Sequence, residues 1–161
     1  MTTNILDETV SALDQGRLPD WIGDHVRRYR ESDGREGHLW DATAVGGSGA
    51  VPCLLLDTLG RKSGRRYTHP LVYGVDADAY VIVASKGGSD LQPQWYHNLL
   101  ATPAVEVQIA AERFTAQAVL ATGSEHARLW RLMTMVYPPY MAYQAKTARV
   151  IPLFRLVRNA P

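Results

Sequence analysis

Residues 104–121, with the sequence AVEVQIAAERFTAQAVLA, indicate the fold class of this chain. From residue 104 to residue 110, valine and isoleucine alternate with glutamate and glutamine, which is typical of a half-buried strand. A second strand-forming run begins at residue 113 and continues to residue 121. Because only two residues separate the two runs, we predict a β-hairpin and therefore an antiparallel sheet.

Further strand-like runs lie on both sides of this hairpin. The runs at 51–58 and 79–85 are apolar at nearly every position, as expected for strands that are buried on both faces. Another strand is predicted between them at 67–75, and a last one at 150–157. About six strands with short connections favour a mainly β fold, an antiparallel β-barrel with added helices. The connections are too short for repeated βαβ units.

The first periodic segment of the chain is the predicted helix at 20–34. Its apolar side chains recur at helical spacing, Asp20 can cap its start and Gly34 can end it. Its other face is expected to carry three arginines: Arg27, Arg28 and Arg30. This segment either packs on the barrel, which we favour, or rests on a membrane surface through residues 20–32.

Two more helical regions follow the predicted strands. A short helix is expected within residues 92–103. Thr122 and Glu125 match a capping box, and the apolar stripe behind them continues until Pro138 and Pro139 end the helix. A further turn or two of helix is expected from Pro139.

The length and composition of the chain indicate one domain over residues 1–161, with a flexible N-terminus over 1–19 and the barrel over 51–157. The formal net charge of +1 disfavours general nucleic-acid binding. A single cysteine, Cys53, excludes a disulfide within the chain and favours a reducing compartment. We therefore expect a cytoplasmic protein, and no run of 18 apolar residues predicts a membrane span.

The stretch DTLGRKSGRRY, residues 57–67, carries an unusual local charge. Four of the six residues after Gly60 are cations, namely Arg61, Lys62, Arg65 and Arg66. The stretch is not a phosphate-binding P-loop, because Arg61 stands where that motif has glycine and a strand follows instead of a helix. A turn rich in glycine and arginine is a candidate anion site. The alternative is a solvated hairpin tip.

Three other groups of residues are candidates for ligand contact. Ser85 and Lys86 follow a buried strand and precede a pair of glycines, although a plain exit from the strand is the alternative. Trp95 and Asn98 share a face of a short helix, and three tyrosines recur at three-residue spacing: Tyr137, Tyr140 and Tyr143. Aromatic side chains at such spacing usually pack in a core.

Metal and nucleophile chemistry have no basis in this sequence. The histidines lack the spacing of metal ligands, and with a single cysteine no metal site is expected. Ser48 does not lie in the strand–turn–helix context of a hydrolase nucleophile.

Several motifs together resemble the deazaflavin-dependent nitroreductase family over roughly residues 25–157. They are HVRRYRESDGREGHLW, LLLDTLGRKSG, PLVYG, YVIVASKGG, QWYHNLLATPAVEVQIAAERFTA, YPPYMAYQAKT and IPLF. The resemblance implies a split β-barrel, similar to the FMN-binding split barrels. It also implies coenzyme F420, a deazaflavin with a phosphate-linked oligoglutamate tail.

The resemblance assigns a role to each candidate residue. The cofactor-binding residues would be Arg61, Lys62, Ser63, Gly64, Arg66, Pro70, Ser85, Lys86, Trp95 and Asn98. Among these, Arg61 and Lys62 would contact the phosphate and tail, with Lys86 in support. Ser85, Trp95 and Asn98 would line the ring. The substrate side would be closed by Tyr137, Tyr140 and Tyr143, and Tyr140 and Ser85 are the candidate catalytic residues. The chain departs from the family pattern at two positions, where Tyr67 replaces an arginine and His69 replaces a threonine.

The implied reaction is hydride transfer from reduced F420 to a small electron acceptor, such as a quinone, a nitroaromatic or an activated alkene. Two alternatives remain open. One is an FMN-dependent split-barrel reductase, and the other is a carrier that binds a cofactor or lipid without catalysis. The sequence shows no self-complementary patch, so it leaves the oligomeric state open.

Overall fold

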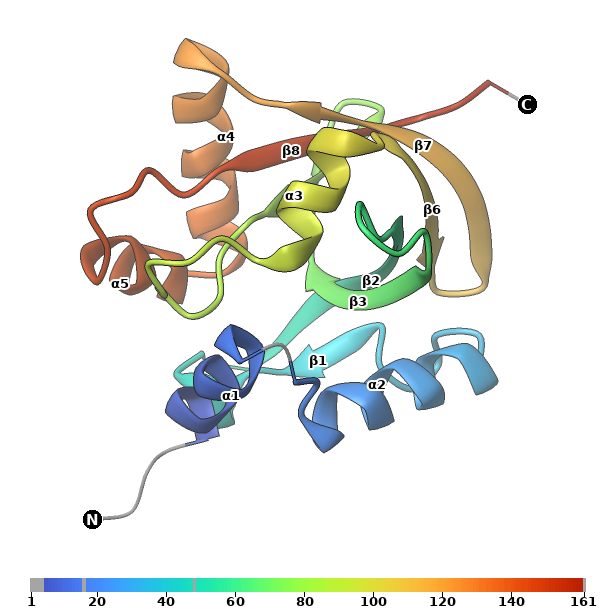
Figure 1. The fold of residues 1–161 in the computed structure, drawn as a ribbon, viewed down its shortest axis with the longest axis horizontal. Coiled ribbons are helices and arrows are strands. Elements are labelled where there is room, and N and C mark those ends of the chain that lie inside the picture. Colours follow the sequence, from blue (N-terminus) through green and yellow to red (C-terminus); the bar gives the residue numbers. More distant parts are fainter. Residues whose placement is uncertain (1–4, 16, 48, 161) are drawn as a thin grey trace.

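The computed structural model describes residues 5–15, 17–47 and 49–160. Within them the chain forms one sheet of eight antiparallel strands, in the order β1-β2-β6-β7-β8-β5-β4, with β3 paired to β2. Figure 1 shows that the sheet curls into a half-open barrel, so the predicted split β-barrel is confirmed. The strands are β1 (Leu39–Asp41), β2 (Ala50–Leu59), β3 (Arg66–Val72), β4 (Gly74–Asp76), β5 (Ala79–Val83), β6 (Ala104–Ile109), β7 (Glu112–Leu120) and β8 (Leu153–Arg158).

The predicted hairpin is present as β6 and β7. Its register places Val107 opposite Phe114 and Ile109 opposite Glu112. Ala110 turns the chain with a φ of 54°, in the left-handed region. Its amide donates to the hydroxyl of Tyr29 at 2.9 Å, so a helix outside the barrel also holds this turn.

Strand β2 joins the two cores of the molecule. Its side chains are buried from Val51 to Thr58, except for half-buried Pro52, as expected for a strand covered on both faces. Cys53 belongs to one apolar cluster with Val72, Met133 and the tyrosines. Leu54 and Leu56 belong to the other, with Trp95 and Phe154. A strand between two cores positions the loop that follows it firmly.

The strand predictions needed three corrections. Residues 67–75 form two strands, β3 and β4, because the chain leaves β2 at Tyr73 and then pairs with β5. Strand β1 was not predicted. The last strand begins at Leu153 rather than residue 150, because Pro152 has no amide hydrogen for a ladder.

Of the five α-helices in the described ranges, four match predicted ones, namely α2 (Asp20–Glu31), α3 (Gln94–Ala101), α4 (Gly123–Val136) and α5 (Pro139–Ala145), and a 3-10 helix spans Thr43–Val45. The predicted caps are wrong: neither Asp20 nor Thr122 makes a side-chain capping hydrogen bond, although Thr122 occupies the N-cap position of α4. Helix α2 ends at Glu31, three residues before Gly34. Helix α1 (Ile5–Asp14) lies where the sequence indicates only a flexible N-terminus.

Helix α2 packs on the barrel, as the sequence favours. Tyr29 is fully buried, and Trp21 stacks on Trp40 with ring centroids 5.8 Å apart. Arg30 does not share the outer face with Arg27 and Arg28 as expected, because its guanidinium turns inward to the carboxylate of Asp57. Two aromatic residues of the segment considered for membrane contact, Trp21 and Tyr29, therefore pack against the protein itself.

Candidate active site

A cavity of about 860 Å³ lies between the sheet and helices α1, α2, α3 and α5. Every site residue expected from the sequence lines it, with the exception of Gly64. The structure thus brings together side chains from the β2–β3 loop, the end of β5, α3 and α5. Gly64 lies in the same loop with a φ of 72°, where its amide donates to the carbonyl of Gly60.

The β2–β3 loop is fixed to α3 through Asn98. The backbone amide and the guanidinium of Arg61 both donate to the Asn98 carbonyl oxygen, at 3.2 and 3.1 Å. The Asn98 amide nitrogen donates to the hydroxyl of Thr58. A buried amide needs such partners, because an unpaired one costs free energy. Asn98 therefore positions the basic loop as well as lining the cavity.

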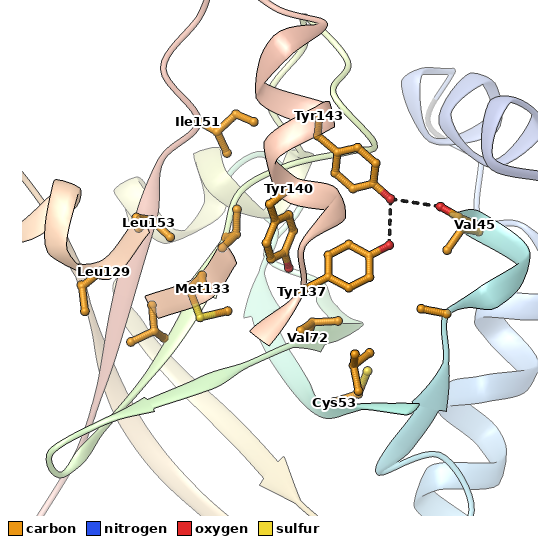
Figure 2. Packing of buried hydrophobic residues seen from close by; sticks show 14 of the residues in the cluster. Val45, Cys53, Val72, Leu129, Met133, Tyr137, Tyr140, Tyr143, Ile151 and Leu153 are labelled. Carbon is orange, nitrogen blue, oxygen red and sulfur yellow. Dashed lines mark hydrogen bonds between the residues drawn. The ribbon is translucent and has the colours of Figure 1, made fainter. Parts of the chain in front are cut away.

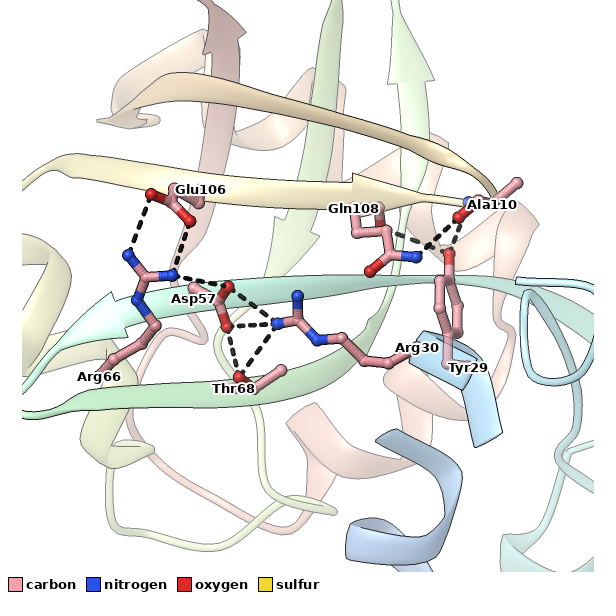
Figure 3. Close-up of polar contacts among 8 residues, drawn as sticks. All are labelled: Tyr29, Arg30, Asp57, Arg66, Thr68, Glu106, Gln108 and Ala110. Carbon is pink, nitrogen blue, oxygen red and sulfur yellow. Dashed lines mark hydrogen bonds and ion pairs between the residues drawn. The ribbon is translucent and has the colours of Figure 1, made fainter. Parts of the chain in front are cut away.

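The cations of this loop differ in how far their charge is neutralised. Arg61 binds only neutral side chains, Asn98 and Gln94, and the structure gives Lys62 no hydrogen bond or ion pair with a described residue. Arg66, in contrast, pairs with Glu106 at 2.9 Å and lies 4.0 Å from Asp57 (Figure 3). Arg65 does not line the cavity, so the positive charge of this loop that is available to a ligand there is that of Arg61 and Lys62.

The loop after β5 carries Ser85 and Lys86. The Ser85 hydroxyl accepts from the amide of Gly88 at 3.3 Å, and the buried Lys86 ammonium forms an ion pair with Asp14 of α1. Gly88 has a φ of 87°, and a Cβ there would lie 2.6 Å from the carbonyl oxygen of Tyr143. The loop therefore packs directly against the backbone of α5.

Arg149 holds the same loop from the other side. Its guanidinium donates to the carbonyl oxygens of Ala84, Ser89 and Leu91 and to the side chain of Gln92. Burial lowers the pKa of Arg149, although the group stays charged at neutral pH. These bonds fix the path of the chain on both sides of Ser85.

The three tyrosines form a cluster, in which Tyr140 and Tyr143 belong to α5 and Tyr137 lies just before it (Figure 2). The hydroxyl groups of Tyr137 and Tyr143 are hydrogen-bonded to each other at 2.8 Å, and Tyr143 also donates to the carbonyl of Val45 at 3.4 Å. The Tyr140 hydroxyl has no hydrogen-bond partner among the described residues. Burial raises the pKa of Tyr140, so its phenol stays protonated and able to donate.

Both departures from the family pattern lie at the cavity. The ring of Tyr67 lies over Gly60, where a Cβ would be 2.7 Å from the ring carbon Cε2. His69 lies on β3 opposite Leu56, and its buried Nε2 has no partner among the described residues. Burial lowers the pKa of His69 to about 4, so the imidazole is neutral at physiological pH.

Helices α1 and α2 supply cavity residues that the sequence analysis did not assign to the site. They are Leu6, Thr9, Val10, Leu13, Trp21, Ile22, Gly23 and Val26. The Trp21 indole donates to the Thr9 hydroxyl at 3.0 Å and so joins the two helices. The spacing of Leu6, Val10 and Leu13 is that of one helix face and would have predicted α1.

Neither a candidate metal site nor a candidate membrane-spanning helix occurs among the described residues. No group of three histidine, cysteine, aspartate or glutamate side chains there is arranged to hold a metal ion. Of the helices in the described ranges, none is long and apolar enough to cross a membrane.

Comparisons with known proteins identify the family. Residues 21–158 match the sequence model of the F420H(2)-dependent quinone reductases. The F420H(2)-dependent quinone reductase Rv1261c of Mycobacterium tuberculosis is 42% identical over 138 residues, which are 84% of this chain and 88% of the relative. A second relative from that organism, the putative F420H(2)-dependent quinone reductase Rv3178, is 40% identical over 106 residues, 66% of this chain and 89% of the relative.

Solved structures give the same result. An F420-H2 dependent reductase, FDR-A, superposes with a TM-score of 0.62 at 40% identity, covering 65% of this chain and 93% of the other. A structure described as a domain-swapped dimer superposes with a TM-score of 0.64 at 35% identity, covering 85% of this chain and 97% of the other. The resemblance noted from the sequence is therefore confirmed, and the chain belongs to the F420H(2)-dependent quinone reductase family.

Proposed function

We propose that this protein transfers a hydride from reduced coenzyme F420 to a quinone. The observation that carries the proposal is a single cavity lined both by unpaired cations and by a tyrosine with a free hydroxyl. Cations suit the anionic arm of the cofactor, and the phenol suits an acceptor that gains negative charge. The family of the chain supports the same activity.

The residues of the cavity fit F420. A volume of about 860 Å³ lies within the usual range of about 300–1,000 Å³ for sites of small molecules. Arg61 and Lys62 would hold the phosphate and the glutamate carboxylates, since guanidinium and ammonium groups bind such anions well. Ser85, Trp95 and Asn98 would line the flat ring, and Pro70 would also contact the cofactor.

Bound F420 in its reduced form supplies the hydride. As a quinone is reduced, negative charge develops on its oxygen, and a positioned hydrogen-bond donor stabilises that charge. Tyr140 has this role in our proposal, because its hydroxyl is protonated and has no hydrogen-bond partner among the described residues. It would then donate its proton to the acceptor, and the resulting phenolate would regain a proton from solvent. Tyr137 and Tyr143, bonded to each other, would form the wall against which the acceptor rests.

Nitroaromatics and activated alkenes are further acceptors that we propose for this cavity, because their reduction also places negative charge on an oxygen. FMN is a weaker candidate as cofactor. It carries one phosphate, whereas Arg61 and Lys62 offer unpaired charge suited to a longer anion. A carrier without catalysis would not need Tyr140 as a proton donor to an acceptor.

The test is a titration of the purified protein with F420, followed by the consumption of reduced F420 with menadione. We expect both binding and turnover. Binding without turnover, with nitro compounds and enones also tried, would favour the carrier. Bound flavin in the purified protein, with no affinity for F420, would favour the FMN-dependent enzyme.

A further inference from the structure

Arg17 lies in the short connection between α1 and α2, and it lines the same cavity as Arg61 and Lys62. Resemblance to the family gives this residue no role, and the sequence alone places it in the N-terminal region before the first predicted helix. The structure brings it to the cavity because α1, which also lines the cavity, lies beside the start of α2 (Figure 1).

Among the described residues, no acidic side chain forms an ion pair with Arg17. Its guanidinium donates to one side chain, the neutral amide oxygen of Gln15, at 3.2 and 2.7 Å. Five described cations line the cavity: Arg17, Arg61, Lys62, Arg66 and Lys86. Arg66 is paired with Glu106, and Lys86 is paired with Asp14. Arg17, Arg61 and Lys62 are therefore the described lining cations that form no ion pair.

The backbone of Arg17 is held in place. Its amide donates to the carbonyl of Ala12 at 2.8 Å, which closes the end of α1. Helix α1 is itself attached to the loop after β5, because Asp14 pairs with Lys86 and accepts from the hydroxyl of Ser89. A cation on a fixed backbone loses less freedom on binding an anion than one on a mobile tail.

We propose that Arg17 is part of the binding site for the anionic arm of the cofactor, which extends between the β2–β3 loop and the α1–α2 connection. The inference rests on the proposed function. Asp14 neutralises Lys86, the cation expected in support of the site, and Arg17 supplies unpaired charge three residues further along the chain.

The test compares the F420 affinities of the wild-type protein, Arg17→Gln and Arg28→Gln, measured by fluorescence titration at low and high salt. Arg28 is the matched control, because it is an exposed arginine that pairs with Asp24 and does not line the cavity. We expect Arg17→Gln to raise the Kd about fivefold at low salt and to weaken the salt dependence. Arg28→Gln should bind as the wild type does.

A cofactor that lacks the glutamates identifies the group that Arg17 contacts. If the effect of Arg17→Gln disappears with this shortened cofactor, Arg17 binds the glutamate carboxylates, and if it persists, Arg17 binds the phosphate. Both results support the proposal. Equal affinities for Arg17→Gln and Arg28→Gln, with the wild type binding F420, overturn it and leave the proposed function intact. Failure of the wild type to bind F420 overturns both.

Discussion

The hydroxyl oxygens of Tyr137 and Tyr143 lie 2.8 Å apart in a hydrogen bond, and Tyr143 also donates to the carbonyl of Val45. The hydroxyl of Tyr140, between them in the sequence, has no hydrogen-bond partner among the described residues. The three rings pack closely, with the centroids of Tyr137 and Tyr140 4.7 Å apart. All three rings therefore pack together, but only Tyr137 and Tyr143 are joined by a hydrogen bond. Two tyrosines are fixed by each other, and the third is available to a ligand.

The first prediction concerns this free hydroxyl. Tyr140→Phe removes one oxygen and leaves the ring packing unchanged. We expect kcat with menadione to fall by a factor of about 10²–10⁴, the usual contribution of a positioned proton donor, while the Kd for F420 stays within about twofold. Tyr137→Phe is the comparison, since its hydroxyl bonds Tyr143, and it should cost less turnover. Equal losses of turnover and cofactor affinity in Tyr140→Phe would contradict the assigned role.

The second prediction concerns Asn98, which joins the basic loop to α3. Asn98→Ala leaves the backbone amide and guanidinium of Arg61 without their acceptor and the Thr58 hydroxyl without its donor. We expect the free energy of unfolding to fall by about 1–3 kcal/mol and the Kd for F420 to rise. Urea denaturation and fluorescence titration measure the two effects. Gln94→Ala removes a single exposed bond to Arg61 and should change both quantities less. If the two variants behave alike, Asn98 does not position the loop.

The sequence predicts the barrel well, because strand signals are local. Alternation over 104–110 and the short turn after it depend only on neighbouring residues, and the hairpin is present as predicted. Helix α1 was not predicted, although Leu6, Val10 and Leu13 have the spacing of one helix face, because acidic and small polar residues separate them. Pro152 shortens the strand predicted at 150–157, which begins at Leu153. The strand predicted at 67–75 is divided in two, because the chain changes its pairing partner at Tyr73.

The residues expected at the site from motif resemblance line one cavity, with the exception of Gly64. The cavity residues from α1 and α2 were not indicated by that resemblance. The resemblance also did not indicate that Asn98 binds Arg61 or that Asp14 pairs with Lys86, because these partners are brought together only by the folded chain. Arg30 was expected on the solvent face for the same reason, since the buried Asp57 that attracts it lies on another element.

The third prediction concerns the close contact between the loop after β5 and α5. A Cβ at Gly88 would lie 2.6 Å from the carbonyl oxygen of Tyr143, and the φ of 87° disfavours side chains. Gly88→Ala should therefore destabilise the protein by at least about 3 kcal/mol and lower turnover, because the tyrosine helix must move. Gly64→Ala is the control, with a φ of 72° and open space around its Cβ, and should cost about 1 kcal/mol. Similar thermal stabilities of the two variants would show that α5 can adjust.

The last prediction concerns His69 and acid. The pKa of His69 is lowered by burial from 6.5 to about 4 in the folded protein. Between these two values the unfolded chain binds a proton that the folded protein does not, so the free energy of unfolding falls as the pH falls. This one group contributes up to about 1.4 kcal/mol per pH unit, and its effect is absent above about pH 6.5.

His69→Thr removes the titrating imidazole at a position where the family pattern has threonine. Urea denaturation of the wild type and the variant, at several pH values from 4 to 7, compares their slopes. We expect the variant to lose less stability per pH unit than the wild type over this range. A slope that does not change would assign the acid sensitivity to other groups. It would also mean that the imidazole is not held neutral beside the cavity, because a solvated histidine would titrate alike in the folded and unfolded chains.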